Sequence, residues 1–271
     1  MFTIPLYDDN PTLRPSVLTW LIIAACVAVY LWQFSLPTRA GEAIVYSLGV
    51  IPAVLFGRAE LPPQLQMVPG WASVFTSMFL HGGWMHLLGN MLYLWIFGNN
   101  VEDAMGHGRF LVFYLLCGLA AALAQSLIDP GSTIPMIGAS GAIAGVLGAY
   151  LMLHPRANVR VLLVIFFYIR LLNVPAVIVL GLWFALQLLS GWGSSAEEGG
   201  VAFWAHIGGF VAGIVLIPLF KDRDVPLFGA PQSQAFQVMP ASHISRGSVP
   251  PVPRRDHSPW DDEDRPRGPW G

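Results

Sequence analysis

Charged residues are scarce in this chain. Asp, Glu, Lys and Arg together make up 11% of its 271 residues, whereas soluble domains average about 25%. Hydrophobic residues reach 55%, and the mean hydropathy is +0.58. Most of the surface must therefore contact lipid or other apolar protein, which excludes an ordinary soluble domain. We expect an all-α polytopic membrane protein in a lipid bilayer.

Other shortages exclude further classes. The net charge of −2 supplies no basic excess, which argues against nucleic acid as a partner. The two cysteines, Cys26 and Cys117, lie in apolar runs and indicate small core residues, not a disulfide framework. The segment 1–15 holds no basic cluster, so we expect no cleavable signal peptide. No internal repeat is evident, which disfavours a transporter.

Six apolar stretches are candidates for membrane spans, which require about 17–25 residues. They are residues 16–36, 84–101, 110–128, 140–154, 174–191 and 201–220. They predict a six-helix membrane domain over residues 16–220, preceded by a cytoplasmic segment, 1–15. Residues 221–271 are rich in proline and charge and bury too little apolar surface to fold, so we expect a disordered cytoplasmic tail.

Basic residues predict the orientation, because they are retained on the cytoplasmic side. Most of them lie at the termini and in the connections on the same side as the termini. The opposite connections hold only Arg39 and Arg58. Both termini are therefore expected to be cytoplasmic, and Ser140, His206 and His86 to lie towards the outer face.

Two apolar stretches do not fit a span. Residues 43–56, in the long first outer connection, predict an interfacial segment. Residues 159–170 are apolar and β-branched but too short to cross before the next span begins. We interpret them as a cytoplasmic-side interfacial or re-entrant element.

A serine opens one of the apolar helices. Gly138-Ala139-Ser140-Gly141 precedes a helix whose small residues Gly141, Ala144, Gly145 and Gly148 share one face. Such faces let two helix backbones approach closely in lipid. At a helix start, unpaired backbone N–H groups also provide donors for an oxyanion at the serine. The alternative is that Ser140 is an N-cap in a packing helix.

A histidine lies on a similar face in the last of the predicted spans. His206 shares its face with Gly209 and Gly213, so the imidazole lies on the side suited to close contact. If that face packs on the helix of Ser140, the imidazole can take the serine proton. The glycines that we expect to support this packing are Gly138, Gly141, Gly145, Gly209 and Gly213. The alternative is a core histidine bonded to a backbone carbonyl.

A second polar pair, His86 and Asn90, occupies one face of the second span, at the i and i+4 positions of a helix. Both side chains can donate hydrogen bonds to a negatively charged oxygen. A metal site is disfavoured, because no HExxH motif exists and no carboxylate accompanies the histidines in the membrane. His81 lies at the mouth of the span and is interpreted as structural. We predict neither a metal nor another cofactor.

Together these segments resemble the rhomboid family of intramembrane serine proteases. The resemblance runs from about residue 71 to residue 220. It rests on four motifs in order, HGGWMHLLGN (81–90), VEDAMGHGRFLVFYLLCG (101–118), GASGAIAG (138–145) and AHIGGFVAG (205–213). It implies a Ser–His dyad without an acidic third residue, with Ser140 as nucleophile and His206 as general base. The Ser140 N–H and the side chains of His86 and Asn90 would form the oxyanion hole.

The chain departs from the family pattern at two positions. Trp71 is followed by Ala72 where the family often has arginine. Ala144 stands where some members place a tyrosine that stacks on the catalytic histidine. Neither change removes a reacting group, but the second leaves open how His206 is supported.

Two further segments have predicted roles. The cluster Glu102-Asp103 with Arg109 also matches the family, and we interpret it as a capped, charge-paired helix turn on the cytoplasmic side. The short outer connection 193–200, which has glycines at both ends, is a candidate movable cap over the site.

We therefore predict hydrolysis of peptide bonds in single-span membrane proteins whose helix unwinds near the outer surface. The six-span layout without a transit peptide suggests a bacterial plasma membrane. Two alternatives stay open. An inert relative that binds transmembrane helices is disfavoured because serine and histidine are both present. A channel or transporter using His86, Asn90 and His206 is disfavoured because no carboxylate lies in the spans.

Overall fold

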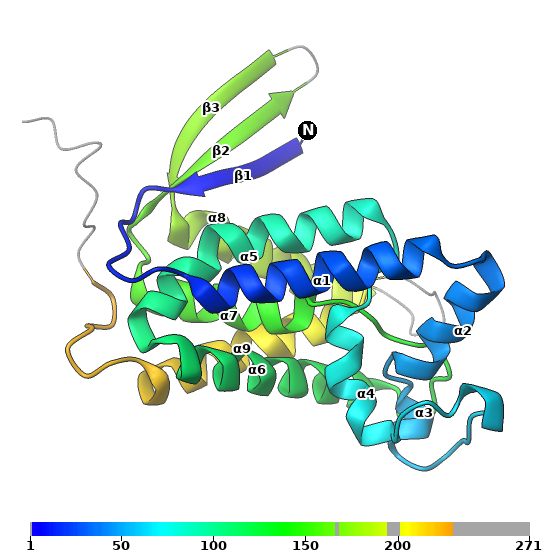
Figure 1. Ribbon diagram of the computed structural model, residues 1–271. Coiled ribbons are helices and arrows are strands. Elements are labelled where there is room, and N and C mark those ends of the chain that lie inside the picture. Colours follow the sequence, from blue (N-terminus) through cyan, green and yellow to red (C-terminus); the bar gives the residue numbers. More distant parts are fainter. Residues whose placement is uncertain (1, 166–167, 194–200, 230–271) are drawn as a thin grey trace, which may run out of the picture. The chain divides into compact units, whose positions relative to one another are not determined.

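Helices form most of the structure. The computed structural model describes residues 2–165, 168–193 and 201–229, which all lie in the first of two compact units, 1–235. A helix occupies each of the six apolar segments (Figure 1). These helices are α1 (Val17–Ser35), α5 (Trp84–Met105), α6 (His107–Ile128), α7 (Ser140–Leu153), α8 (Ala176–Gly193) and α9 (Phe203–Phe220). Helices α1, α6 and α9 are long and apolar enough to cross a membrane, and α7 and α8 are apolar but shorter. Six crossings and cytoplasmic termini stay predictions.

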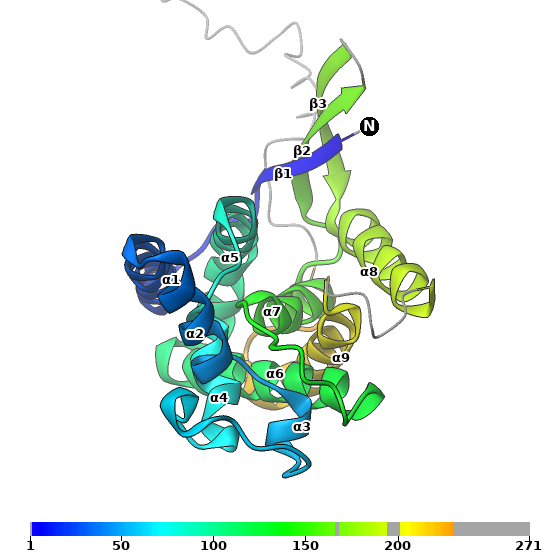
Figure 2. The ribbon, with the colours of Figure 1, turned by 90° about the vertical axis from the view of Figure 1, so that its right-hand side faces the viewer.

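Helix α7 is the innermost element. Every residue from Gly141 to Tyr150 is buried, and Figure 2 shows α7 end on, between α5, α6 and α9. A helix that is apolar on all sides is stable only where protein or lipid surrounds it. Its Gly and Ala residues leave room for the neighbouring helices to approach closely.

The long connection between α1 and α5 is folded into short helices. They are α2 (Thr38–Leu48), α3 (Pro52–Leu55), η1 (Pro63–Leu65), α4 (Gly70–Thr76) and η2 (Ser77–Phe79). Two backbone contacts join this connection to the segment that enters α7. Val50 pairs with Met136 in an isolated β-bridge, and the Gly138 N–H donates to the Ser77 carbonyl at 2.9 Å. The start of α7 is thereby held in place.

The prediction of an all-α fold is wrong in one region. A three-stranded antiparallel sheet is formed by β1 (Phe2–Asp8), β2 (Asn158–Ile165) and β3 (Tyr168–Pro175), in the order β1–β2–β3. The 159–170 segment is thus a β-hairpin, completed by a strand from the segment predicted as the cytoplasmic N-terminus. β-branched residues favour strands. However, β1 is separated from its partner β2 along the chain by four helices of the bundle, α1, α5, α6 and α7. A local sequence pattern cannot reveal such pairing.

A carboxylate of α5 caps the N-terminus of α1. Glu102 is buried and accepts the backbone N–H groups of Leu18 and Thr19, each at 2.8 Å. These are two of the N–H groups that an α-helix leaves unpaired in its first turn. The negative charge also lies at the positive end of the α1 dipole. His107 Nδ1 lies 2.6 Å from the same carboxylate.

Arg109 pairs with a residue outside the predicted cluster. Its guanidinium lies 2.7 Å from Asp222, just beyond α9, and the Arg14 guanidinium lies 2.9 Å from the same carboxylate. The hydrogen bond from Arg14, followed by that from Arg109, lowers the pKa of Asp222. The first residues after α9 also pack on the helices, since the Gly229 N–H donates to the Leu153 carbonyl at 3.0 Å. From residue 230, the predicted tail lies outside the described residues.

Strand β1 is joined to two helices through Asp8. Its Oδ2 accepts the Tyr150 hydroxyl of α7 at 2.7 Å and the Asn100 side-chain N–H of α5 at 2.8 Å. Burial raises the pKa of the Asp8 carboxyl from 3.8 to about 6. The folded protein therefore binds this proton more tightly than the unfolded chain does.

Asp8→Asn tests this linkage. The stabilising contribution of the Asp8 proton is complete below a pH of about 3.8 and is lost as the pH rises through about 6. Asn keeps an acceptor oxygen for Tyr150 but does not titrate. We expect the unfolding midpoint of the wild type in detergent to fall, relative to that of Asp8→Asn, between pH of about 4 and about 7. The exposed Glu60→Gln is the control. Parallel midpoints in wild type and Asp8→Asn would contradict the linkage.

Candidate active site

Helices α7 and α9 pack backbone against backbone. A Cβ atom at Gly209 would overlap the Gly141 carbonyl oxygen, and one at Gly213 would overlap the Gly145 carbonyl oxygen. Four of the five glycines predicted to support packing therefore face one another across this contact. The fifth, Gly138, lies outside it, before the start of α7.

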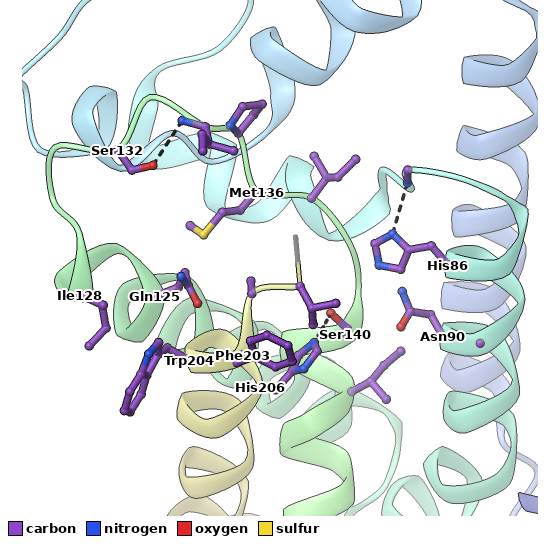
Figure 3. Close-up of a pocket in the computed structure, with 18 of the residues that line it drawn as sticks. His86, Asn90, Gln125, Ile128, Ser132, Met136, Ser140, Phe203, Trp204 and His206 are labelled. Carbon is purple, nitrogen blue, oxygen red and sulfur yellow. Dashed lines mark hydrogen bonds between the residues drawn. The ribbon is translucent and has the colours of Figure 1, made fainter. Parts of the chain in front are cut away.

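The close contact brings the predicted nucleophile and base together. Ser140 Oγ lies 2.9 Å from His206 Nε2, and His206 Nδ1 lies 2.8 Å from Gln187 Oε1 of α8. Figure 3 shows the serine and the histidine meeting between α7 and α9. Ala139, not Ser140, occupies the N-cap position of α7. Both ring nitrogens of His206 face side chains, whereas the alternative of a core histidine assumed a backbone carbonyl.

Gly138 shapes the wall beside the serine. Its φ of +124° lies in a region that side-chain-bearing residues rarely adopt. A Cβ at this position would lie 2.7 Å from His86 Nε2. Gly138 thus allows the backbone to turn before α7 and leaves room for the His86 ring. This role differs from the helix packing that was predicted.

His86 and Asn90 supply hydrogen-bond donors to the same space. The Gly82 N–H donates to His86 Nδ1 at 3.3 Å, so the neutral ring carries its proton on Nε2, the nitrogen nearest Gly138. Asn90 is 8% exposed, and its Nδ2 has no hydrogen-bond partner among the described residues. Two donors from one face of α5 therefore lie near the Ser140 hydroxyl, as Figure 3 shows.

These groups line one cavity of about 990 Å³. Its wall includes Ser140, His206, His86, Asn90 and residues of the α6–α7 connection such as Met136. His81 is not among the lining residues. In the part of the chain that the structure describes, no three His, Cys, Asp or Glu side chains are placed to hold a metal ion. Residues 194–200 of the predicted cap lie outside the described residues.

Two glutamines near the site were not predicted. Gln187 faces His206, and Gln125 Oε1 of α6 accepts the Ala205 N–H at 3.2 Å, in the first turn of α9. Each is an amide inside an apolar helix, and polar residues in such positions usually have a function. That signal was present in the sequence, but it could not identify the partner.

A family model described as Rhomboid domain matches residues 69–223, more than half of the chain. The chain is similar to Rhomboid protease GluP of Bacillus subtilis, at 35% identity over 197 residues, 72% of this chain and 33% of that protein. It is also similar to Rhomboid protein 1, mitochondrial, of Saccharomyces cerevisiae, at 30% identity over 190 residues, 64% of this chain and 51% of that protein. Rhomboid-like protein 11, chloroplastic, of Arabidopsis thaliana is 27% identical over 174 residues, 58% of each chain. The chain thus spans 33–58% of the length of these relatives.

Gly213→Ala tests whether the helix contact holds the site together. The added methyl group overlaps the Gly145 carbonyl, so α7 and α9 must separate. Overpacking of this kind costs about 1–3 kcal/mol, and we expect reactivity at Ser140 to fall with stability. Gly181→Ala in α8 is the matched control, because a Cβ there meets no atom of the described residues within 4 Å. Equal stability and reactivity in the two variants would argue against the contact.

Proposed function

The chain belongs to the rhomboid family, and from this premise we propose that it is an intramembrane serine endopeptidase. It would cleave peptide bonds in or near the transmembrane helices of single-span membrane proteins. One observation supports this most: a hydroxyl and an imidazole nitrogen lie 2.9 Å apart in a cavity that also holds side-chain donors. A nucleophile in hydrogen-bond contact with a base is the requirement for acyl transfer.

The reaction begins with proton transfer. His206 Nε2 takes the Ser140 proton as Oγ attacks the substrate carbonyl, and a tetrahedral intermediate forms. When the C–N bond breaks, the amine leaves with the proton from His206. Water then attacks the acyl-serine while His206 takes its proton. The ester bond to Oγ breaks, His206 returns the proton to Oγ, and the carboxylic acid product and free Ser140 result. No cofactor enters these steps.

The negative oxygen of the intermediate requires donors. The first backbone N–H groups of a helix have no intrahelical acceptor, and the Ser140 N–H belongs to this set. His86 Nε2 and Asn90 Nδ2 lie near Gly138, two residues before Ser140, and we propose that the three groups donate to the same oxygen. Donors fixed before the reaction stabilise a developing charge without reorganisation. The buried Asn90 amide, which lacks an acceptor among the described residues, is suited to this task.

The substrate class follows from hydrogen bonding. The carbonyls in the interior of a transmembrane helix are all paired with backbone N–H groups, so a protease must act where the helix opens. Helices weakened by Gly or Pro are therefore expected substrates. The arginine distribution supports a site facing the outer side. We place the protein in a bacterial plasma membrane, although its relatives include mitochondrial and chloroplastic proteins.

Ser140→Ala and His206→Ala test the reacting pair. With purified protein in detergent, we expect the wild type to react with a fluorophosphonate probe and to cleave a single-span reporter. Both activities should be lost in each variant. Labelling that persists in Ser140→Ala would identify a different nucleophile. A folded wild type that neither labels nor cleaves would favour the inert helix-binding alternative.

Asn90→Ala tests the oxyanion donors. Loss of one such donor lowers kcat on the order of 100-fold to 1,000-fold. We expect this fall in reporter cleavage with little change in KM, because the donor acts mainly in the transition state. Asn173→Ala, on the exposed part of β3, is the matched control. A rise in KM with unchanged kcat would instead make Asn90 a substrate-binding residue.

A further inference from the structure

Gln187 is the one side-chain amide in α8, within an otherwise apolar run from Ala176 to Leu189. An amide in lipid or in an apolar interior is unfavourable unless it is paired. Its Oε1 lies 2.8 Å from His206 Nδ1, and the other ring nitrogen lies 2.9 Å from Ser140 Oγ. Three side chains from α7, α9 and α8 thus form one hydrogen-bonded chain.

Which ring nitrogen of His206 carries the proton decides whether the serine can be activated. A neutral imidazole carries one proton, on Nδ1 or on Nε2. If Nδ1–H donates to Gln187 Oε1, Nε2 holds a lone pair and can accept the Ser140 proton. If the proton is on Nε2, the ring cannot act as the base. An acceptor at Nδ1 therefore selects the reactive tautomer.

We propose that Gln187 is a positioning residue that fixes the tautomer and the ring orientation of His206. The inference rests on the proposed function. It adds to Ser140 and His206 a third, neutral residue that takes part by hydrogen bonding alone. During proton transfer from Ser140 to Nε2, the Nδ1–H bond to Oε1 persists, and Gln187 gains and loses no proton. A neutral acceptor does this without placing a charge among apolar helices.

Trp183 supports the same assignment. It lies one helical turn before Gln187 on α8, and its ring centroid is 5.8 Å from that of His206, at an interplanar angle of 37°. The fully buried Ala144 of α7 has no ring to stack on the histidine. In this chain, therefore, α8 contacts His206 through an indole and an amide oxygen on one face.

The test compares Gln187→Met, which keeps the side-chain length but removes the acceptor, with Gln187→Glu, which keeps an acceptor oxygen. The exposed Leu189→Ala on the same helix is the matched control. In full-length protein in detergent, kcat and KM for the single-span reporter and the rate of fluorophosphonate labelling are measured. The tautomer of His206 is read from nitrogen-15 NMR of histidine-labelled protein, assigned with His206→Ala.

We expect Gln187→Met to lower kcat and the labelling rate by roughly 10-fold to 100-fold, as for the loss of a partner to a buried donor. Its KM should stay near the wild-type value, and its His206 should lose the uniform Nδ1–H tautomer. Gln187→Glu should recover most of the labelling rate. Leu189→Ala should match the wild type.

Wild-type kcat in folded Gln187→Met would overturn the proposal while leaving Ser140 and His206 as the reacting pair. An equal defect in Gln187→Glu, or an unchanged tautomer in Gln187→Met, would reduce Gln187 to a packing residue. A wild type that does not label, by contrast, would overturn the protease function itself.

Discussion

The close approach of α7 and α9 is the constraint on which the rest of the site depends. Ser140 and His206 belong to different helices and are distant in the chain, yet their side chains meet at 2.9 Å. Helices with larger side chains at their contact pack with axes about 8–10 Å apart. Here glycines face carbonyl oxygens across the contact, so the backbones lie closer and the side chains of Ser140 and His206 can reach each other.

The surrounding elements hold this pair in place. Helix α5 contributes the donors His86 and Asn90, and α8 contributes Gln187. The connection between α1 and α5 fixes the entry to α7 through the Val50–Met136 bridge. At its other end, α7 is bonded through Tyr150 to Asp8 of β1. A central helix anchored at both ends holds the serine hydroxyl in place, as the proposed catalysis requires.

Much of the fold could be predicted, because membrane spans follow simple rules of length and hydropathy. The six apolar segments are helices, and the small-residue faces suggested which helices pack closely. The sheet could not be predicted, since strand β1 at the start of the chain pairs with a hairpin that follows α7. Gln187 was also missed, because a single amide in an apolar run carries no motif. Arg109 pairs with Asp222 rather than with the nearby acidic residues, a choice made only by the tertiary structure.

Buried polar atoms without a hydrogen-bond partner indicate what kind of group the site can bind. Four buried side-chain atoms have no hydrogen-bond partner among the described residues: His81 Nε2, Asn90 Nδ2, Tyr114 Oη and Ser126 Oγ. Of their residues, Asn90 alone lines the cavity. An unpaired buried donor costs about 1–3 kcal/mol, and here an acceptor that enters the cavity can relieve that cost. A carbonyl oxygen that becomes negative at Ser140 is such an acceptor, and it gains more from the donor than a neutral carbonyl does. The unpaired amide of Asn90 thus favours a site suited to a transition state over one that only binds helices.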